Sequence, residues 1–236
     1  MPRFIYHAYA TALGGRIRRP LVHHIDAQAA CVLPSTGGRV AARAPAYSLT
    51  DPASGEFILS FDSAETSIEG GQTRPGLHAT TLTCTVKNIN IANVLRAAEV
   101  VSRLQLTYNT ANHSFTIDTS GSRFGNLTIG GQVFDVTVDH ALGMEAADYH
   151  AFRQAHPEYP ETRGAIRHSL GRHPALVFEP FDNGYLHRPN FGRVYFCEWS
   201  AAPYAQMLTM LRLRLGSPQE GDLEIGVCGG NGQDYP

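Results

Sequence analysis

The chain has 236 residues, of which 17% are charged, and its 19 basic and 21 acidic side chains give a net charge of -2. A typical globular protein has about a quarter of its residues charged. A protein that binds nucleic acid by neutralising many phosphates is therefore not expected. Lys87 is the only lysine and lies outside any glycine-rich segment, which excludes a P-loop and a Schiff-base lysine.

The N-terminal sequence has no unbroken apolar region of secretory length, and no window approaches the roughly 18 consecutive apolar residues that a membrane helix needs. We therefore expect a cytoplasmic protein that does not bind a membrane. The four cysteines are far apart and lie in apolar, strand-like segments, at Cys31, Cys84, Cys197 and Cys228. This pattern predicts small buried residues rather than a zinc site, with a reactive thiol as the alternative.

Alternation of apolar and polar residues predicts strands through the first half of the chain. Strand-like runs occur near residues 4–13, 16–24, 28–33, 39–49 and 56–69. The next strand has Leu82, Cys84 and Val86 on one face, and the apolar phase then shifts to Ile89 and Ile91. This shift predicts a β-bulge near Lys87 and Asn88.

The middle of the chain is less uniform. Residues 93–103 fit either a helix face or a strand, and we favour a strand from about Glu99 because strands flank the segment. Alternation continues to residue 129, where Gly130-Gly131 predicts a tight hairpin. Residues 144–156 predict a helix and residues 164–170 a short helical turn. Residues 140–190 therefore form a predicted helical and loop insertion.

Strands resume at residues 192–199 and again at 208–215, where Leu211, Leu213 and Leu215 share one face. The other face of that last strand is expected to carry Met210, Arg212 and Arg214. These patterns predict an all-β fold, a mostly antiparallel β-sandwich or flattened barrel with a short helix-containing insertion. We expect one domain over residues 1–236.

The layout resembles that of bacterial β-rich domains called choice-of-anchor proteins of the P-type. The resemblance rests on AYATALGG, TVKNINIANV, SGSRFGNLTIGG, FGRVYFCEW and GDLEIGVCGGNG, each in the corresponding order along the chain. It implies a β-sandwich-like fold and a non-catalytic protein. We identify no counterpart in this sequence of the C-terminal anchoring tail typical of that family. We also identify no counterpart in the family of the 140–190 insertion.

Histidines are frequent, 11 in all, but none shows a metal-ligand spacing such as H-E-x-x-H. His23 and His24 should point to opposite faces of a strand and so cannot share one metal ion. We expect no metal site and no cofactor. The Asp139-His140 pair is the best acid/base candidate among the histidines, because it lies where a strand ends and the insertion begins.

The segment FEPFDNGYLHRPNFG combines charged and aromatic residues, as a small-molecule or sugar site does, although the aromatics can equally anchor a loop. Glu198, on an apolar strand, is a further carboxylate whose pKa would rise if it faced a cavity. The candidate catalytic residues are Asp139, His140, Glu179, Asp182, His187 and Glu198. The candidate binding residues are Phe181, Tyr185, Arg188 and Phe191.

Two functions remain open. The first is a non-catalytic binding or self-assembly protein that forms homo-oligomers or binds a small-molecule or carbohydrate ligand, and that does not bind nucleic acid. The alternative is a cofactor-independent hydrolase, lyase or isomerase that acts on a small polar or carbohydrate substrate through its histidine and carboxylate cluster.

Overall fold

The computed structural model describes residues 3–138, 163–165, 168–169, 176–177, 185–202 and 205–235. Every regular element in these ranges is a strand, and neighbouring strands pair antiparallel. The predicted all-β fold is therefore confirmed. In the part of the chain that the structure describes, no helix is long and apolar enough to cross a membrane.

The strands form two large sheets. Sheet A has nine strands, in the order β17-β18-β19-β20-β21-β1-β2, with β15 added beside β19 and β3 beside β1. Their bounds are β1 Arg3–Arg19, β2 His23–Gln28, β3 Cys31–Val32, β15 Arg163–Ala165, β17 Leu176–Val177, β18 Tyr185–Arg188, β19 Gly192–Ala202, β20 Ala205–Leu215 and β21 Glu220–Tyr235.

Sheet B has ten strands, with β9 and β8 at its centre. Their bounds are β4 Gly38–Ala44, β5 Tyr47–Thr50, β6 Phe57–Phe61, β7 Ser63–Arg74, β8 Leu77–Ile91, β9 Leu95–Asn109, β10 Ser114–Asp118, β11 Arg123–Gly125, β12 Thr128–Ile129 and β13 Gln132–Val133. Two further short strands, β14 Thr137–Val138 and β16 His168–Ser169, pair with each other.

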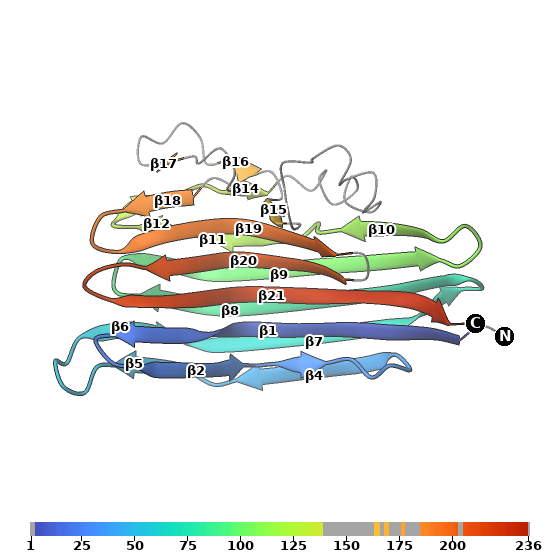
Figure 1. The fold of residues 1–236 in the computed structure, drawn as a ribbon, viewed down its shortest axis with the longest axis horizontal. Helices are drawn as coiled ribbons and strands as arrows, with labels where there is room; N and C mark the ends of the chain where they lie inside the picture. Colours follow the sequence, from blue (N-terminus) through green and yellow to red (C-terminus); the bar gives the residue numbers. More distant parts are fainter. Residues whose placement is uncertain are drawn as a thin grey trace.

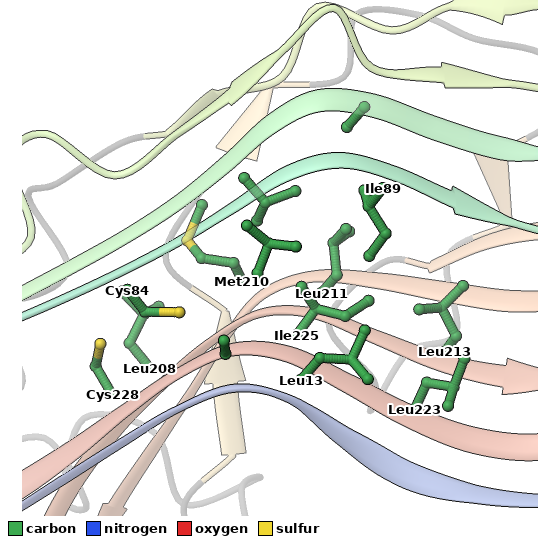
Figure 2. Packing of buried hydrophobic residues seen from close by; sticks show 14 of the residues in the cluster. Leu13, Cys84, Ile89, Leu208, Met210, Leu211, Leu213, Leu223, Ile225 and Cys228 are labelled. Carbon is green, nitrogen blue, oxygen red and sulfur yellow. The ribbon is translucent and has the colours of Figure 1, made fainter. Parts of the chain in front are cut away.

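The two sheets pack face to face, with β1, β20 and β21 in front of β7, β8 and β9 in Figure 1. Their inner faces supply the apolar core, which includes Leu13, Leu82, Leu211 and Ile225, each fully buried. Figure 2 shows these leucine and isoleucine side chains of sheet A pointing toward the strands of sheet B. Burial of this apolar surface is the main force that holds the sheets together.

In both sheets the alternation of inward-facing and outward-facing residues is interrupted at one row of residues that crosses several strands. Beyond this irregular row, the positions that face the core are shifted by one residue. In β8 the shift is at Asn88, which has a φ of 52° and is skipped in the pairing with β9. The predicted phase shift is therefore confirmed, but it is not a β-bulge, because Lys87 pairs with Glu99 and Ile89 with Ala97 in an unchanged register. In sheet A the row includes Cys197 with a φ of 52° and Gly226 with a φ of 68°. Met210 of β20 pairs with no residue of β19 or β21. The residues of β20 that face the core are Leu211 and Leu213 on one side of this row and Met210 and Leu208 on the other.

Other local predictions have mixed outcomes. The Gly130-Gly131 hairpin is confirmed, because both glycines have positive φ and join β12 to β13. The strand predicted from Glu99 begins earlier, at Leu95. The short helical turn predicted at 164–170 is wrong, because the described residues there belong to strands β15 and β16. The helix predicted at 144–156 lies outside the described residues.

The placement of Met210 on the arginine face is also wrong. Met210 is fully buried in the core together with Leu211, because the irregular row turns both consecutive residues inward. The cysteine prediction holds for three positions, since Cys84, Cys197 and Cys228 are buried, whereas Cys31 is half-buried. Burial raises the pKa of all three buried thiols, that of Cys228 to about 12, so they are poor nucleophiles.

Candidate functional site

The outer face of sheet A, the face turned away from sheet B, carries several buried residues that are polar or charged. Tyr195, Glu198 and Arg212 are 0%, 6% and 7% exposed, although they point away from the core. Val194 and Phe196 flank Tyr195 on β19 and belong to the core, which places Tyr195 on the outer face. Buried polar groups need partners, and Glu198 and Arg212 supply them to each other, whereas the Tyr195 hydroxyl has no hydrogen-bond partner among the described residues.

Glu198 and Arg212 form a bidentate ion pair. The Arg212 Nε lies 2.5 Å from Glu198 Oε2, and the Nη2 lies 2.6 Å from Oε1. The guanidinium also lies over the Tyr195 ring, with Cζ 3.8 Å from the ring centroid. The irregularity at Cys197 makes this arrangement possible, because strict alternation after Phe196 would turn Glu198 into the core.

The same stacking extends toward β18. The Tyr185 and Tyr195 rings are 5.3 Å apart, and Arg193 Cζ lies 4.8 Å from the Tyr185 centroid. Arg214 Cζ lies 5.8 Å from the Tyr195 centroid, and its side chain is exposed. We call Tyr185, Tyr195, Arg193, Arg212 and Arg214 the arginine–tyrosine cluster. Its rings help to hold the guanidinium groups in fixed positions, that of Arg212 buried and that of Arg214 exposed.

The strand register continues this charged surface across sheet A. Arg193 pairs with Arg214, Arg214 with Asp222, and Asp222 with Arg16. We call these four residues the arginine row. It crosses four strands, which is about 14 Å at the usual strand spacing. Beyond its ends the register places His187 opposite Arg193 and His24 opposite Arg16.

The outer face is more positive than the chain as a whole. Arg18, on the same face of β1, forms an ion pair with Asp222. Arg16 and Arg214 are exposed and form no ion pair with any residue that the structure describes. Among the described residues this face carries the arginines Arg16, Arg18, Arg193, Arg212 and Arg214 and the carboxylates Asp26, Glu198, Asp222 and Glu224. The described part of this face thus has a small excess of positive charge in a chain whose net charge is -2.

The described candidate residues occupy different environments. Tyr185 is buried in the arginine–tyrosine cluster, and His187 is exposed beside Arg193. Arg188 lies against the hairpin of sheet B, since a Cβ added to Gly130 would come within 2.0 Å of Arg188 Cζ. Phe191 is part of the apolar core. Tyr185, His187 and Glu198 are thus on the outer face, whereas Arg188 and Phe191 help to join the two sheets.

The other five candidates lie outside the described residues, namely Asp139, His140, Glu179, Phe181 and Asp182. Among the candidate acid/base groups that can be placed, His187 and Glu198 do not converge. His187 is opposite Arg193, and Glu198 is five positions further along β19 than Arg193, a span of about 16 Å. Within the described ranges, no group of three histidine, cysteine or carboxylate side chains could hold a metal ion.

A second polar cluster lies between the sheets, where β1 and β8 begin. Tyr6 Oη is 2.8 Å from His78 Nδ1, and the His78 ring stacks on Phe4 with centroids 4.0 Å apart. Tyr6 is buried, and Phe4 packs against the core. These contacts join sheet A to sheet B, which explains the cluster as a structural one.

The predicted separation of His23 and His24 is confirmed. His23 pairs with the inward-facing Ile17 and His24 with the outward-facing Arg16, so the two side chains lie on opposite faces of β2.

Sequence reasoning missed Arg16, Arg193 and Tyr195 as parts of a site, and it treated Arg212 and Arg214 only as the outer face of a strand. The alternation at 208–215 does indicate that two arginines share that face. Their meeting with Arg193 and Arg16 depends on pairing between strands up to about 200 residues apart in the chain. No local pattern encodes that register.

Comparison with known proteins gives one match. A family model described as a domain of unknown function (DUF8256) matches residues 4–173. No curated protein and no solved structure shows significant similarity to the chain. The match does not test the resemblance to choice-of-anchor domains, which stays a prediction. Because the family model covers more than half of the sequence, the chain belongs to the DUF8256 family.

Proposed function

We propose that the protein is a non-catalytic binding protein whose ligand is an acidic carbohydrate, bound on the outer face of sheet A. The observation that carries this proposal is the arginine row, in which Arg214 and Arg16 are exposed cations on either side of Asp222. Arginine presents a planar set of donors that matches a carboxylate.

Preorganisation supports binding at this face. Arg193 lies over the Tyr185 ring and Arg214 lies near the Tyr195 ring, so their guanidinium groups lose little freedom when a ligand arrives. Arg193 and Arg214 are also directly opposite each other on adjacent strands, where like charges repel. Arg214, the exposed member of this pair, is the one that a carboxylate of the ligand can reach.

The mixture of charges favours a carbohydrate over a more densely charged polymer. Asp222 and Glu224 lie on the same face as the arginines. Carboxylates repel closely spaced phosphates but accept hydrogen bonds from hydroxyl groups. A sugar acid offers both a carboxylate, which arginine binds, and hydroxyl groups, which can donate hydrogen bonds to Asp222 and Glu224.

Glu198 supports a binding rather than a catalytic role. Both of its oxygens accept hydrogen bonds from Arg212 in a buried pair, so it is held as a structural anion. A general acid or base must instead reach the proton that it transfers. Homo-oligomer formation, the other half of the sequence-based expectation, stays a prediction that native mass spectrometry tests.

The test is isothermal titration with polygalacturonate, a polymer with a carboxylate on each sugar, and with neutral dextran. We expect the wild type to bind polygalacturonate and not dextran, with an affinity that falls as salt is added. Arg16→Gln/Arg214→Gln should weaken binding at least about tenfold, which corresponds to about 1.4 kcal/mol.

The matched control is Arg39→Gln/Arg74→Gln, which removes two exposed arginines from β4 and β7 of sheet B. We expect this variant to bind polygalacturonate within about twofold of the wild type, since it changes the net charge equally but leaves sheet A intact. Equal weakening by both double variants, or equal binding of dextran, would contradict the proposal.

A further inference from the structure

Tyr9 forms an exposed aromatic surface on the same outer face of sheet A. Tyr9 is 42% exposed, one of four large hydrophobic residues described as exposed. Its ring lies directly over Gly229 of β21, because a Cβ added to Gly229 would come within 2.6 Å of Tyr9 Cζ. The hydroxyl donates to Met207 Sδ of β20 at 3.1 Å. The absence of a side chain at Gly229 thus lets the ring lie against the sheet.

The neighbours of Tyr9 extend this aromatic surface. Val32 of β3 pairs with Tyr9 and is 71% exposed, and Met207 is half-buried on the other side of Gly229. We call Val32, Tyr9, Gly229 and Met207 the Tyr9 platform. A ring fixed in place with one side open to solvent suits a sugar, whose C–H groups pack on aromatic faces while its hydroxyls stay in water.

The Tyr9 platform and the arginine row are joined along β1. Tyr9 and Arg16 both face outward, seven residues apart, a path of at most about 23 Å. Between them, the outward residues of β1 are Thr11 and Gly14, which have small side chains. A chain of several sugars can therefore lie along this path without a bulky side chain in its way.

The Tyr9 hydroxyl lies near a carboxylate. Burial raises the pKa of this hydroxyl, and the negative charge of Glu224 raises it further. Tyr9 therefore stays an uncharged phenol at neutral pH and adds no repulsion toward a carboxylate. No arginine pairs directly with the Tyr9 platform in the described register, so this end of the path relies on stacking.

We propose that the ligand is a polysaccharide that contacts both regions, with its carboxylates on the arginine row and one sugar stacked on the Tyr9 platform. This inference rests on the proposed function and adds the length of the ligand and a second contact. A ligand that spans two joined contacts gains affinity from both, whereas a short one occupies the arginine row alone.

The experiment compares polygalacturonate with digalacturonate, using wild type, Tyr9→Leu, Tyr9→Phe and Gly229→Ala. Tyr9→Leu removes the ring, and we expect it to weaken polygalacturonate binding about fivefold while leaving digalacturonate binding unchanged. Gly229→Ala should have the same effect, because the new methyl group displaces the ring without changing any charge. Tyr9→Phe keeps the ring and should bind within about twofold of the wild type.

The outcomes separate this inference from the proposed function. If the wild type binds neither ligand, the proposed function fails. If it binds polygalacturonate but Tyr9→Leu binds it equally well, only the Tyr9 contact is wrong. A third result also overturns the inference, namely that Tyr9→Leu converts an oligomer to a monomer in native mass spectrometry, because a second copy of the chain would then cover the Tyr9 platform.

Discussion

The Glu198–Arg212 pair offers the sharpest test of how the outer face is built. Both side chains are less than a tenth exposed, at 8% and 9%, so solvent screens their attraction little. Breaking a buried ion pair by removing one charge costs about 3–5 kcal/mol, because the remaining charge loses its compensation. In Glu198→Gln the amide oxygen still accepts one hydrogen bond, worth about 1 kcal/mol.

We therefore expect Glu198→Gln to lower the free energy of unfolding by about 3 kcal/mol. For a chain of this size, that corresponds to a fall of roughly 6–12 °C in Tm. Glu65→Gln is the matched control, because the Arg43–Glu65 pair is 79% and 56% exposed. An exposed pair contributes between about 0 and 1 kcal/mol, so the control should stay close to the wild type.

A double substitution separates the ion pair from simple packing. Glu198→Leu/Arg212→Met removes both charges, and apolar replacement of a buried pair is often neutral or stabilising. We expect it to recover most of the stability that Glu198→Gln loses. Urea denaturation followed by tryptophan fluorescence measures all four proteins, since Trp199 adjoins Glu198 on β19. A loss under about 1 kcal/mol for Glu198→Gln, or no recovery in the double variant, would refute this reasoning.

Three further results are expected. Gly15→Ala should destabilise the protein by about 2–5 kcal/mol in urea unfolding, whereas Gly38→Ala should cost about 1–2 kcal/mol. Both glycines have positive φ, but only at Gly15 would a Cβ meet backbone, at 2.2 Å from a carbonyl oxygen, so equal losses would contradict the steric argument. Iodoacetamide should label Cys31 alone before denaturation and all four cysteines after it, as mass spectrometry can count. Hydrogen bonds from the Ser54 hydroxyl and from the Ala53 and Ser54 backbone amides lower the pKa of Asp51 in the folded protein. The ionised carboxylate therefore stabilises the fold fully above its unfolded-state pKa, and this stabilisation is lost as the pH falls through its folded-state pKa. Asp51→Asn should therefore reduce the fall in Tm with acid, and an unchanged profile would refute the assignment.

The sequence predicted the fold class because the alternation that defines a half-buried strand is local. The phase shift near Asn88 was predictable for the same reason, since the apolar positions move visibly from Val86 to Ile89. In sheet A the equivalent shift is hidden in the sequence. Val194 to Cys197 is an unbroken apolar run, and the alternation at Met210 continues without a break. Periodicity alone could not place Met210 in the core.

The candidate site was harder to predict because it depends on register. Glu198 was recognised as an unusual carboxylate, but its partner Arg212 is fourteen residues away on the next strand. Arg16 and Arg193 join Arg214 only through pairing across β19, β20, β21 and β1. Tyr9 was not singled out, because its exposure depends on Gly229 beneath the ring. Such contacts follow from strand order, which alternation does not specify.

The central claim is that the outer face of sheet A binds an acidic polysaccharide. A titration of isotope-labelled protein with polygalacturonate, followed through backbone amide resonances, tests it most directly. We predict that the largest shifts occur at Arg16, Arg214 and Asp222 and extend along β1 to Tyr9, with sheet B largely unchanged. Shifts centred on sheet B, or no shifts at saturating polymer, would contradict the claim.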